Sequence, residues 1–174
     1  EVEDLSQKEF QKRDKDFHIL IFGGSQGAHS INMVVKAAIE KGGEWLKDTK
    51  IIHQTGPYDY AAILESYKGR NGIEAHEYLY QMEMNYEWAD LVICRAGAST
   101  VAEIAAAAKP ALFIPLPWAA DDHQRRNAES LVDHRAAAML LQKDLTPSSL
   151  IQKIEDLKKD TQHLKEMREN LNKF

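Results

Sequence analysis

Residues 17–27 read FHILIFGGSQG, an apolar run that ends directly in a glycine-rich loop. A run of consecutive apolar side chains, here 19–22, is typical of a strand buried on both faces of a parallel sheet. The glycines permit a tight turn, and apolar side chains then recur at helical spacing over 28–42. This strand–loop–helix unit predicts a β-α-β protein whose ligands bind beyond the carboxyl ends of its strands.

The same alternation continues to the end of the chain. Strands are predicted at 17–22, 50–54, 73–78, 90–94, 111–114 and 137–141. Helices are predicted at 28–42, 58–67, 81–88, 99–108, 123–134, 147–158 and 161–173. Six strands with helices between them predict an α/β fold with one doubly wound, Rossmann-like parallel sheet. Residues 1–16 are rich in charge and amide, so we expect a linker or a surface helix as an entry segment there, and a single domain at 17–174.

The composition of the 174-residue chain argues against several classes of protein. Asp and Glu number 27 against 22 Lys and Arg, and no segment gathers cations, so a nucleic-acid partner is not expected. Cys94 is the single cysteine, and no Cys/His set has zinc spacing, so we expect a reducing cytoplasm and no metal. No apolar stretch reaches about 18 residues, and residues 1–4 do not resemble a signal peptide, so no membrane span or secretion is expected.

The loop after the first predicted strand suits a diphosphate. Free N–H groups at a helix start favour an anion, and glycines let it approach the backbone. The Gly-Gly-x-x-Gly spacing differs from the dinucleotide fingerprint, and the second strand ends without an acidic residue, so NAD is not expected. A P-loop is excluded because no Gly-Lys-Ser/Thr follows. A plain turn in which Ser25 caps the helix remains the alternative. The candidate binding residues are Gly24, Ser25, Gln26 and Gly27.

The loop after the fourth predicted strand has a second small-residue turn at a helix start. Glu103 can accept hydrogen bonds from both hydroxyls of a ribose. Equally, Thr100-x-x-Glu103 has the spacing of a capping box, in which Glu103 would only close its own helix. Arg95 can neutralise a phosphate or pair with a surface carboxylate.

The loop after the fifth predicted strand is bounded by prolines and then densely polar. His123, Gln124 and Asn127 carry neutral donors and acceptors that suit sugar hydroxyls. Asp121-x-x-Gln124 also reads as a capped helix start, which is the alternative. A metal at 121–123 is not expected, because no partner ligand is evident.

Five motifs, in this order, resemble the MurG family of bacterial transferases. They are Gly-Gly-Ser-Gln-Gly at 23–27, Gln-Thr-Gly at 54–56, the run 85–98, Glu-Ile-Ala at 103–105, and the run 121–128. That family moves N-acetylglucosamine from UDP-GlcNAc to the lipid-linked muramoyl-pentapeptide, converting lipid I to lipid II in peptidoglycan synthesis. The resemblance runs from about residue 17 to the end and covers the family's carboxyl-terminal half. It implies the donor-binding, C-terminal domain of a type B (GT-B) glycosyltransferase.

The resemblance also implies roles for single residues. Ser25 corresponds to a serine near the diphosphate, and Leu79 to a position whose backbone binds uracil. Glu103 corresponds to the ribose ligand. His123 and Gln124 correspond to a glutamine pair that reads the GlcNAc hydroxyls, with histidine in the first place. The nucleotide-binding turn corresponds to Ala98, Ser99, Thr100, Val101, Ala102 and Glu103.

By the same resemblance, the whole protein is an inverting hexosyltransferase that needs no cofactor and lies peripherally on the inner face of the plasma membrane. Its acceptor site and general base belong to an amino-terminal domain, so this chain alone is expected to be inactive and its catalytic residues stay unknown. One alternative is a UDP-sugar epimerase or hydrolase, for which His123, Asp121 and Asp122 are the available acid and base groups. The other is a non-catalytic nucleotide-sugar-binding subunit that needs a separate acceptor domain.

Overall fold

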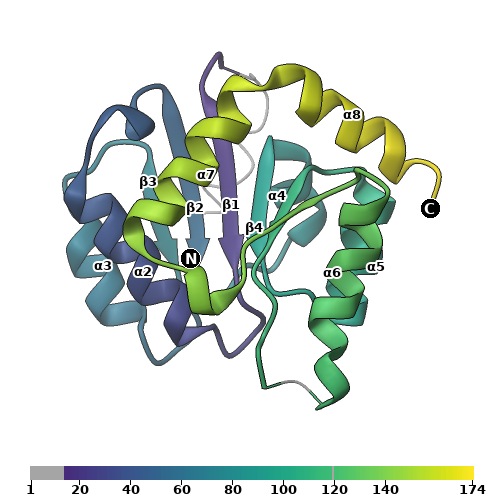
Figure 1. The fold of residues 1–174 in the computed structure, drawn as a ribbon. Coiled ribbons are helices and arrows are strands. Elements are labelled where there is room, and N and C mark those ends of the chain that lie inside the picture. The colour runs from purple at the N-terminus through teal and green to yellow at the C-terminus, as the bar shows by residue number, and fades with distance from the viewer. Residues whose placement is uncertain (1–13, 119) are drawn as a thin grey trace.

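The structure, a computed structural model, describes residues 14–118 and 120–174 (Figure 1). Most of the predicted linker at 1–16 therefore lies outside the described residues. Six parallel strands form one sheet in the order β3-β2-β1-β4-β5-β6. Their bounds are β1 (Phe17–Phe22), β2 (Thr49–Gln54), β3 (Ile73–His76), β4 (Leu91–Cys94), β5 (Ala111–Phe113) and β6 (Ala138–Met139). The predicted α/β fold with a doubly wound sheet is confirmed.

Helices connect the strands and follow the last one. They are α2 (His29–Lys41), α3 (Tyr60–Tyr67), α4 (Met82–Trp88), α5 (Ala98–Ala107), α6 (His123–Asp133), α7 (Pro147–Lys159) and α8 (Thr161–Leu171). Short 3-10 turns lie at η1 (Glu44–Leu46), η2 (Ala120–Asp122) and η3 (Gln142–Asp144). The predicted helix ends agree with these to within two residues. The third and sixth strands are shorter than predicted.

The two short strands end where the regular ladder with their neighbours ends. The β2–β3 register ends at Gln54 opposite His76; the amides of Thr55 and Gly56 still donate to the carbonyls of His76 and Glu77, and the Leu79 amide then meets the Gln54 side chain. β6 can pair only along the three residues of β5, and two of its residues do so. The length of a strand therefore depends on the strand with which it pairs. The predictions over 73–78 and 137–141 treated each segment alone and were too long.

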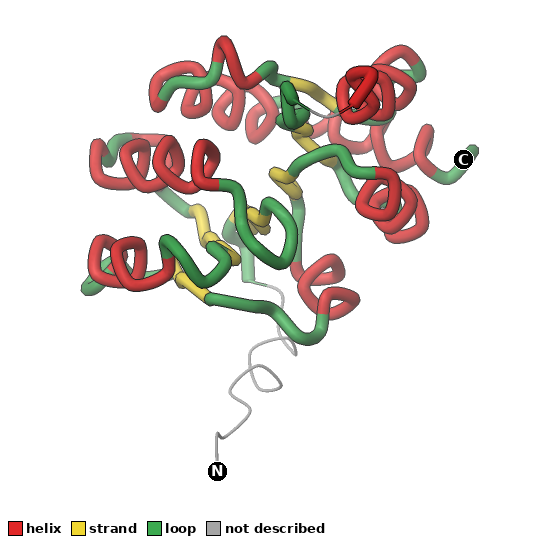
Figure 2. Tube along the Cα trace, turned by 90° about the horizontal axis from the view of Figure 1, so that it is seen from below, coloured by secondary structure: helices red, strands yellow, loops and turns green. Residues whose placement is uncertain are grey.

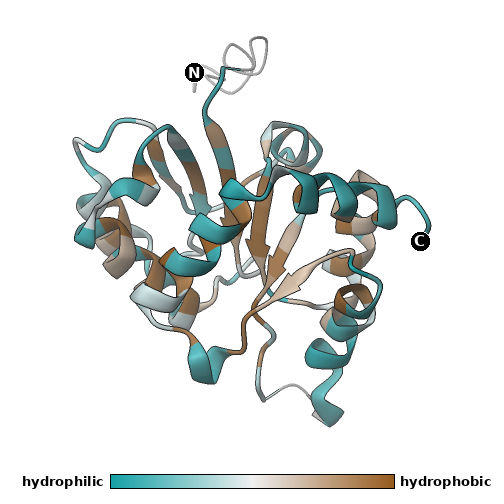
Figure 3. Ribbon diagram, turned by 45° about the horizontal axis from the view of Figure 1, so that its top comes forward, coloured by the Kyte–Doolittle hydropathy of each residue, from teal (hydrophilic) through white to brown (hydrophobic). Residues whose placement is uncertain are grey.

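The core forms two layers, one on each face of the sheet. Successive residues of a strand point to opposite faces, so Ile19 and Ile21 pack with α2, α3 and α7, whereas Leu20 and Phe22 pack with α4, α5 and α6. Figure 3 shows these strands as brown ribbons between helices whose outer sides are largely teal. Helix α8 joins the two layers, because Leu164 contacts the first cluster and Leu171 the second.

The parallel arrangement brings the loops that follow the strands to one edge of the sheet. The strand arrows in Figure 1 point downward, and Figure 2 looks from below onto this carboxyl edge. Neighbouring strands β1 and β4 lead away to opposite faces, because the helix after β1 lies in one layer and the helix after β4 in the other. Ligands of doubly wound sheets bind at such a reversal of strand order.

Candidate functional site

The glycine loop after β1 lies directly against the loop after β2. Gly27 has φ +81°, and a Cβ built there would lie 2.0 Å from the Thr55 carbonyl oxygen. Gly24 has φ +102°, but a Cβ there would meet nothing within 4 Å. The loop is therefore tightly packed behind Gly27 and open at Gly24, where a ligand can approach the backbone.

The helices after β1 and β4 begin at this edge without a side-chain cap. The N-cap of α2 is Ala28 and that of α5 is Gly97; neither N-cap makes a side-chain cap, and neither first turn contains an acidic residue, although the Asp59 carboxylate bonds to His29 and Asn32 at the start of α2. The alternative in which Ser25 caps α2 is therefore wrong, and Ser25 is exposed in the loop. The first N–H groups of a helix have no partner within it, so these two starts favour an anion.

Gln54, at the end of β2, links the glycine loop to the segment after β3. Its Nε2 donates to the Gly24 carbonyl (3.1 Å), and its Oε1 accepts from the Leu79 amide (2.8 Å). The Gln54 side chain is buried, so both contacts are shielded from water. The Leu79 amide is therefore engaged within the protein, and the predicted contact of the Leu79 backbone with uracil stays a prediction.

Glu103 is held by a tyrosine from the preceding helix. The Tyr86 hydroxyl donates to Glu103 Oε2 (2.8 Å). Burial, with the hydrogen bond to Glu103, raises the pKa of Tyr86, so the hydroxyl remains a donor. The capping-box alternative is wrong, because α5 begins at Ala98 and places Thr100 and Glu103 inside the helix. Glu103 is exposed and its carboxylate is held by Tyr86, while its predicted role as ribose ligand stays a prediction.

Gln124 and Asn127 fasten the loops after β4 and β5. Gln124 Oε1 accepts from the amides of Ala96 (3.1 Å) and Leu116 (3.0 Å), and Asn127 Nδ2 donates to the Ala96 carbonyl (3.0 Å). The Gln124 Nε2 lies 4.0 Å from where a Cβ of Gly97 would be, which places this amide beside the start of α5. The predicted reading of sugar hydroxyls by these two residues stays a prediction, and their loop-holding role is new.

The start of α6 has an uncommon backbone conformation. Asp121 and Asp122 have φ of 52° and 57°, a left-handed region that aspartate tolerates better than most residues. Asp122 is the N-cap of α6 and makes no side-chain cap, so the alternative of a capped start at 121–124 is wrong. His123 is the first residue of α6 and is exposed.

Arg95 is a buried cation behind the start of α5. Its Nη1 donates to the carbonyls of Ile114 (3.1 Å) and Pro115 (3.3 Å). The alternative in which Arg95 pairs with a surface carboxylate is therefore wrong. Burial lowers the pKa of the guanidinium, although arginine keeps its charge in proteins. The positive charge adds to the anion-favouring potential of this edge.

Sequence reasoning missed a buried hydrogen-bond network under the glycine loop. Asn32 Nδ2 donates to the Thr55 carbonyl (2.8 Å) and to Asp59 (2.9 Å), so its Oδ1 accepts from His53 Nε2 (2.9 Å). His53 Nδ1 then accepts from the Tyr67 hydroxyl (2.8 Å). Burial lowers the pKa of His53 to about 3, consistent with a neutral ring. The signal in the sequence was two polar residues at buried positions of a strand and a helix.

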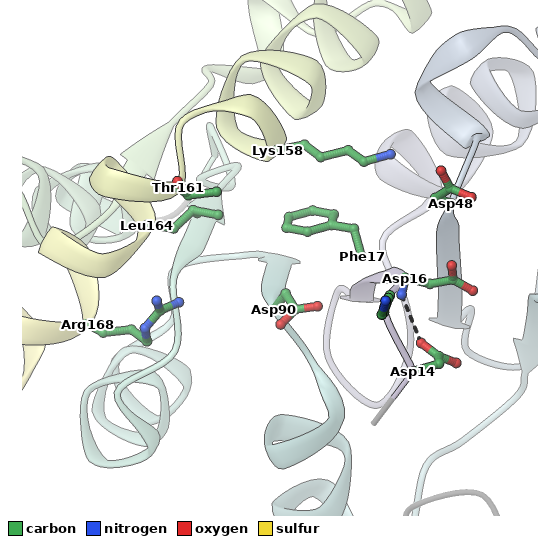
Figure 4. A pocket seen from close by; sticks show the side chains of 10 residues that line it. Asp14, Asp16, Phe17, Asp48, Asp90, Lys158, Thr161, Leu164 and Arg168 are labelled. Atoms are coloured by element: carbon green, nitrogen blue, oxygen red, sulfur yellow. Dashed lines mark hydrogen bonds between the residues drawn. The ribbon is translucent and has the colours of Figure 1, made fainter. Parts of the chain in front are cut away.

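A cavity of about 450 Å³ lies at the opposite, amino-terminal edge of the sheet (Figure 4). It is lined by residues that precede β1, β2 and β4 and by residues of α7 and α8, among them Asp16, Phe17, Asp48, Asp90, Lys158 and Arg168. Lys158 is already held, since it donates to the Thr49 hydroxyl (2.9 Å). The cavity is remote from the loops described above, so it does not belong to the candidate site.

The structure thus places every predicted site residue at or just inside the carboxyl edge. They lie in the glycine loop (Gly24, Ser25, Gln26, Gly27), after β3 (Leu79), from β4 into α5 (Arg95, Ala98, Ser99, Thr100, Val101, Ala102, Glu103), and at the start of α6 (His123, Gln124, Asn127). Across the described residues, no group of three or more His, Cys, Asp or Glu side chains is arranged to hold a metal ion. No helix in the described ranges is long and apolar enough to cross a membrane.

The doubly wound sheet, with uncapped helix starts at its carboxyl edge, places the chain in the class of Rossmann-like α/β domains. The family model described as "Glycosyltransferase family 28 C-terminal domain" matches residues 18–174, and the chain belongs to this family. The membership and the six-stranded sheet confirm the predicted C-terminal domain of a GT-B glycosyltransferase.

Curated relatives carry the name UDP-N-acetylglucosamine–N-acetylmuramyl-(pentapeptide) pyrophosphoryl-undecaprenol N-acetylglucosamine transferase. One from Bdellovibrio bacteriovorus is 44% identical over 162 residues, which are 92% of this chain and 45% of the relative. One from Geobacter sulfurreducens is 42% identical over 167 residues, 94% of this chain and 46% of the relative. The chain therefore spans a little under half the length of these relatives, and the resemblance noted in its motifs is confirmed.

Solved structures agree with this assignment. The crystal structure of Acinetobacter baumannii MurG superposes with a TM-score of 0.82 at 36% identity, covering 96% of this chain and 48% of that one. The calicheamicin glycosyltransferase CalG4 superposes with a TM-score of 0.69 at 19% identity, covering 92% and 37%. The second likeness shows the fold alone.

Proposed function

We propose that this domain binds UDP-N-acetylglucosamine as the donor-binding part of an inverting transferase. The full enzyme would pass N-acetylglucosamine to undecaprenyl-diphospho-muramoyl-pentapeptide, converting lipid I to lipid II. The observation that carries the proposal is that α2 and α5 start from the loops of neighbouring strands β1 and β4, with the Tyr86–Glu103 pair on the side of α5. A nucleoside diphosphate presents the complementary groups, an anionic diphosphate for the helix starts and a vicinal diol for the carboxylate.

The diphosphate would lie between the glycine loop and the start of α5. The open side of Gly24 admits it to the backbone, and the exposed hydroxyls of Ser25 and Ser99 can donate to its oxygens. Negative charge grows on the departing UDP as the sugar leaves, and both helix starts point partial positive charge at it. Buried Arg95 strengthens this potential in a medium that screens it weakly.

The nucleoside would lie toward α4 and α5. Glu103 can accept from both ribose hydroxyls, because the Tyr86 bond holds the carboxylate in place while the side chain stays exposed. The Leu79 carbonyl is available for the uracil N–H, because Gln54 occupies the Leu79 amide. These contacts supply affinity for UDP itself, before any contact to the sugar.

The hexose would lie toward the start of α6. His123 is exposed there. The Gln124 Oε1 accepts from the amides of the two loops, so its Nε2 is the group that can donate to a sugar hydroxyl. A rigid donor beside the α5 start suits recognition of sugar hydroxyls, because little side-chain freedom is lost on binding.

The acceptor hydroxyl, its general base and the contact with the membrane are proposed to belong to the part of the relatives that this chain does not span. Inverting transfer needs a base to remove the proton of the attacking hydroxyl. No metal or other cofactor is needed in this scheme, because helix starts and Arg95 stabilise the leaving diphosphate. The proposed site of action is the cytoplasmic face of the plasma membrane, where a soluble UDP-sugar meets a lipid-linked acceptor.

Calorimetric titration of the chain with UDP, UDP-GlcNAc, UDP-glucose and NAD tests the proposal. We expect UDP and UDP-GlcNAc to bind and NAD not to bind. Failure of both uridine ligands, at concentrations where full-length relatives bind them, would refute a donor site in this domain. Release of UDP from UDP-GlcNAc by the chain alone would instead support the hydrolase alternative.

A further inference from the structure

Large aromatic side chains are exposed at the carboxyl edge of the sheet. Tyr58, Tyr78 and Tyr80 follow β2 and β3, whereas Trp118 follows β5 on the other flank of the candidate site. Trp118 is 80% exposed, although an indole is among the side chains with most to gain from burial. Single exposed apolar side chains are common, but Trp118 lies six residues before Gln124 in a loop of the candidate site, so its indole is open to a ligand bound there.

The backbone that leads to Trp118 is firmly held. Arg95 donates to the carbonyls of 114 and 115, and the amide of Leu116 donates to Gln124 Oε1 (3.0 Å). Pro115 and Pro117 restrict the φ angles of this segment. The indole is thus displayed two residues beyond an anchored position, which reduces the entropy lost when a ligand stacks on it.

We propose that Trp118 is a stacking platform for the donor hexose. The inference rests on the proposed function, in which the nucleoside lies toward Leu79 and Glu103. Gln124 connects the loop of Trp118 with Ala96, two residues before α5 begins at Ala98. A ligand that crosses this helix start with its nucleoside toward Glu103 therefore places its sugar on the side of Trp118.

The chemistry of a hexopyranose suits this arrangement. Its ring has an apolar face of C–H groups, while its hydroxyls project around the rim. Stacking buries the C–H face on the indole, and the rim hydroxyls remain free to bond with His123 and Gln124. UDP lacks the hexose, so Trp118 should contribute to binding of UDP-sugars and not of UDP.

The three tryptophans make a direct test possible by nuclear magnetic resonance of the indole N–H groups. Trp45 is buried, and Trp88 stacks on His18 with ring centroids 4.4 Å apart, so both are internal references. We expect UDP-GlcNAc to shift the Trp118 signal strongly and UDP to shift it little. Equal shifts with both ligands would overturn the inference.

Variants complete the test. Trp118→Ala should weaken UDP-GlcNAc binding roughly three- to tenfold and leave UDP binding unchanged, while Trp118→Phe should restore most of the loss. Tyr80→Ala, a control that removes an aromatic 88% exposed on the other flank, should leave the ratio of the two affinities unchanged. An unaltered ratio with Trp118→Ala would refute the platform. A wild-type chain that binds neither ligand would refute the proposed function itself.

Discussion

Gly24 and Gly27 lie three residues apart in the loop after β1, and substituting each by alanine separates backbone strain from close packing. Both have positive φ, so either substitution places an L-residue in the left-handed region, at about 1–2 kcal/mol. A Cβ at Gly27 would also lie 2.0 Å from the Thr55 carbonyl oxygen, whereas at Gly24 it meets nothing within 4 Å. Moving the packed loop adds about 1–3 kcal/mol.

We therefore expect Gly27→Ala to lower the free energy of unfolding by roughly 2–5 kcal/mol and Gly24→Ala by about 1–2 kcal/mol. For a chain of this size each kcal/mol corresponds to about 2–4 °C in Tm. Urea and thermal unfolding followed by circular dichroism measure the difference. Gly24→Ala should nevertheless weaken UDP binding, because its Cβ projects where the diphosphate approaches. Equal losses of stability would refute the packing argument, and unchanged UDP affinity in Gly24→Ala would refute the location of the diphosphate.

Three further predictions concern other side chains. Tyr86→Phe should weaken UDP and UDP-GlcNAc equally, by about 1 kcal/mol, since it frees Glu103; calorimetry on Glu103→Ala and the double variant should show that the effects are not additive. Gln124→Ala should lower Tm, because two loop amides lose their acceptor, and should weaken UDP-GlcNAc more than UDP; equal losses for both ligands would remove its sugar-reading role. Because the pKa of His53 is lowered from 6.5 to about 3, the unfolded chain binds more protons in that window, so stability should fall as pH drops from about 6.5 toward 3; urea titrations should show a shallower fall in His53→Gln.

Local pattern accounts for the secondary structure and for the edge at which the site forms. Short apolar runs predicted the strands, and apolar residues at helical spacing predicted the helices. These patterns are visible in the sequence because strand and helix formation depend on residues only a few positions apart. The order of units then required a parallel sheet, since a crossover helix separates each pair of strands. Once the strands are parallel, the loops after them must share one edge.

Capping was the question that local pattern left open. Thr100-x-x-Glu103 and Asp121-x-x-Gln124 both have capping spacing, yet neither makes the cap. Helix α5 begins at Ala98 and helix α6 at His123. The side chains of Glu103 and Gln124 bond instead to Tyr86 and to the Ala96 amide. Spacing alone cannot decide between a local and a distant partner of similar strength.

The amino-acid sequence by itself determined the strands, the helices, the glycine loop and the edge where ligands bind, because these follow from hydrogen bonding and burial between near neighbours. Only the tertiary structure decided how the site is held. Gln54 meets Leu79 across 25 residues, Tyr86 meets Glu103 across 17, and Gln124 meets Ala96 across 28. Such contacts carry no periodic signal, since the chain between them must first fold before the two side chains come within hydrogen-bond distance.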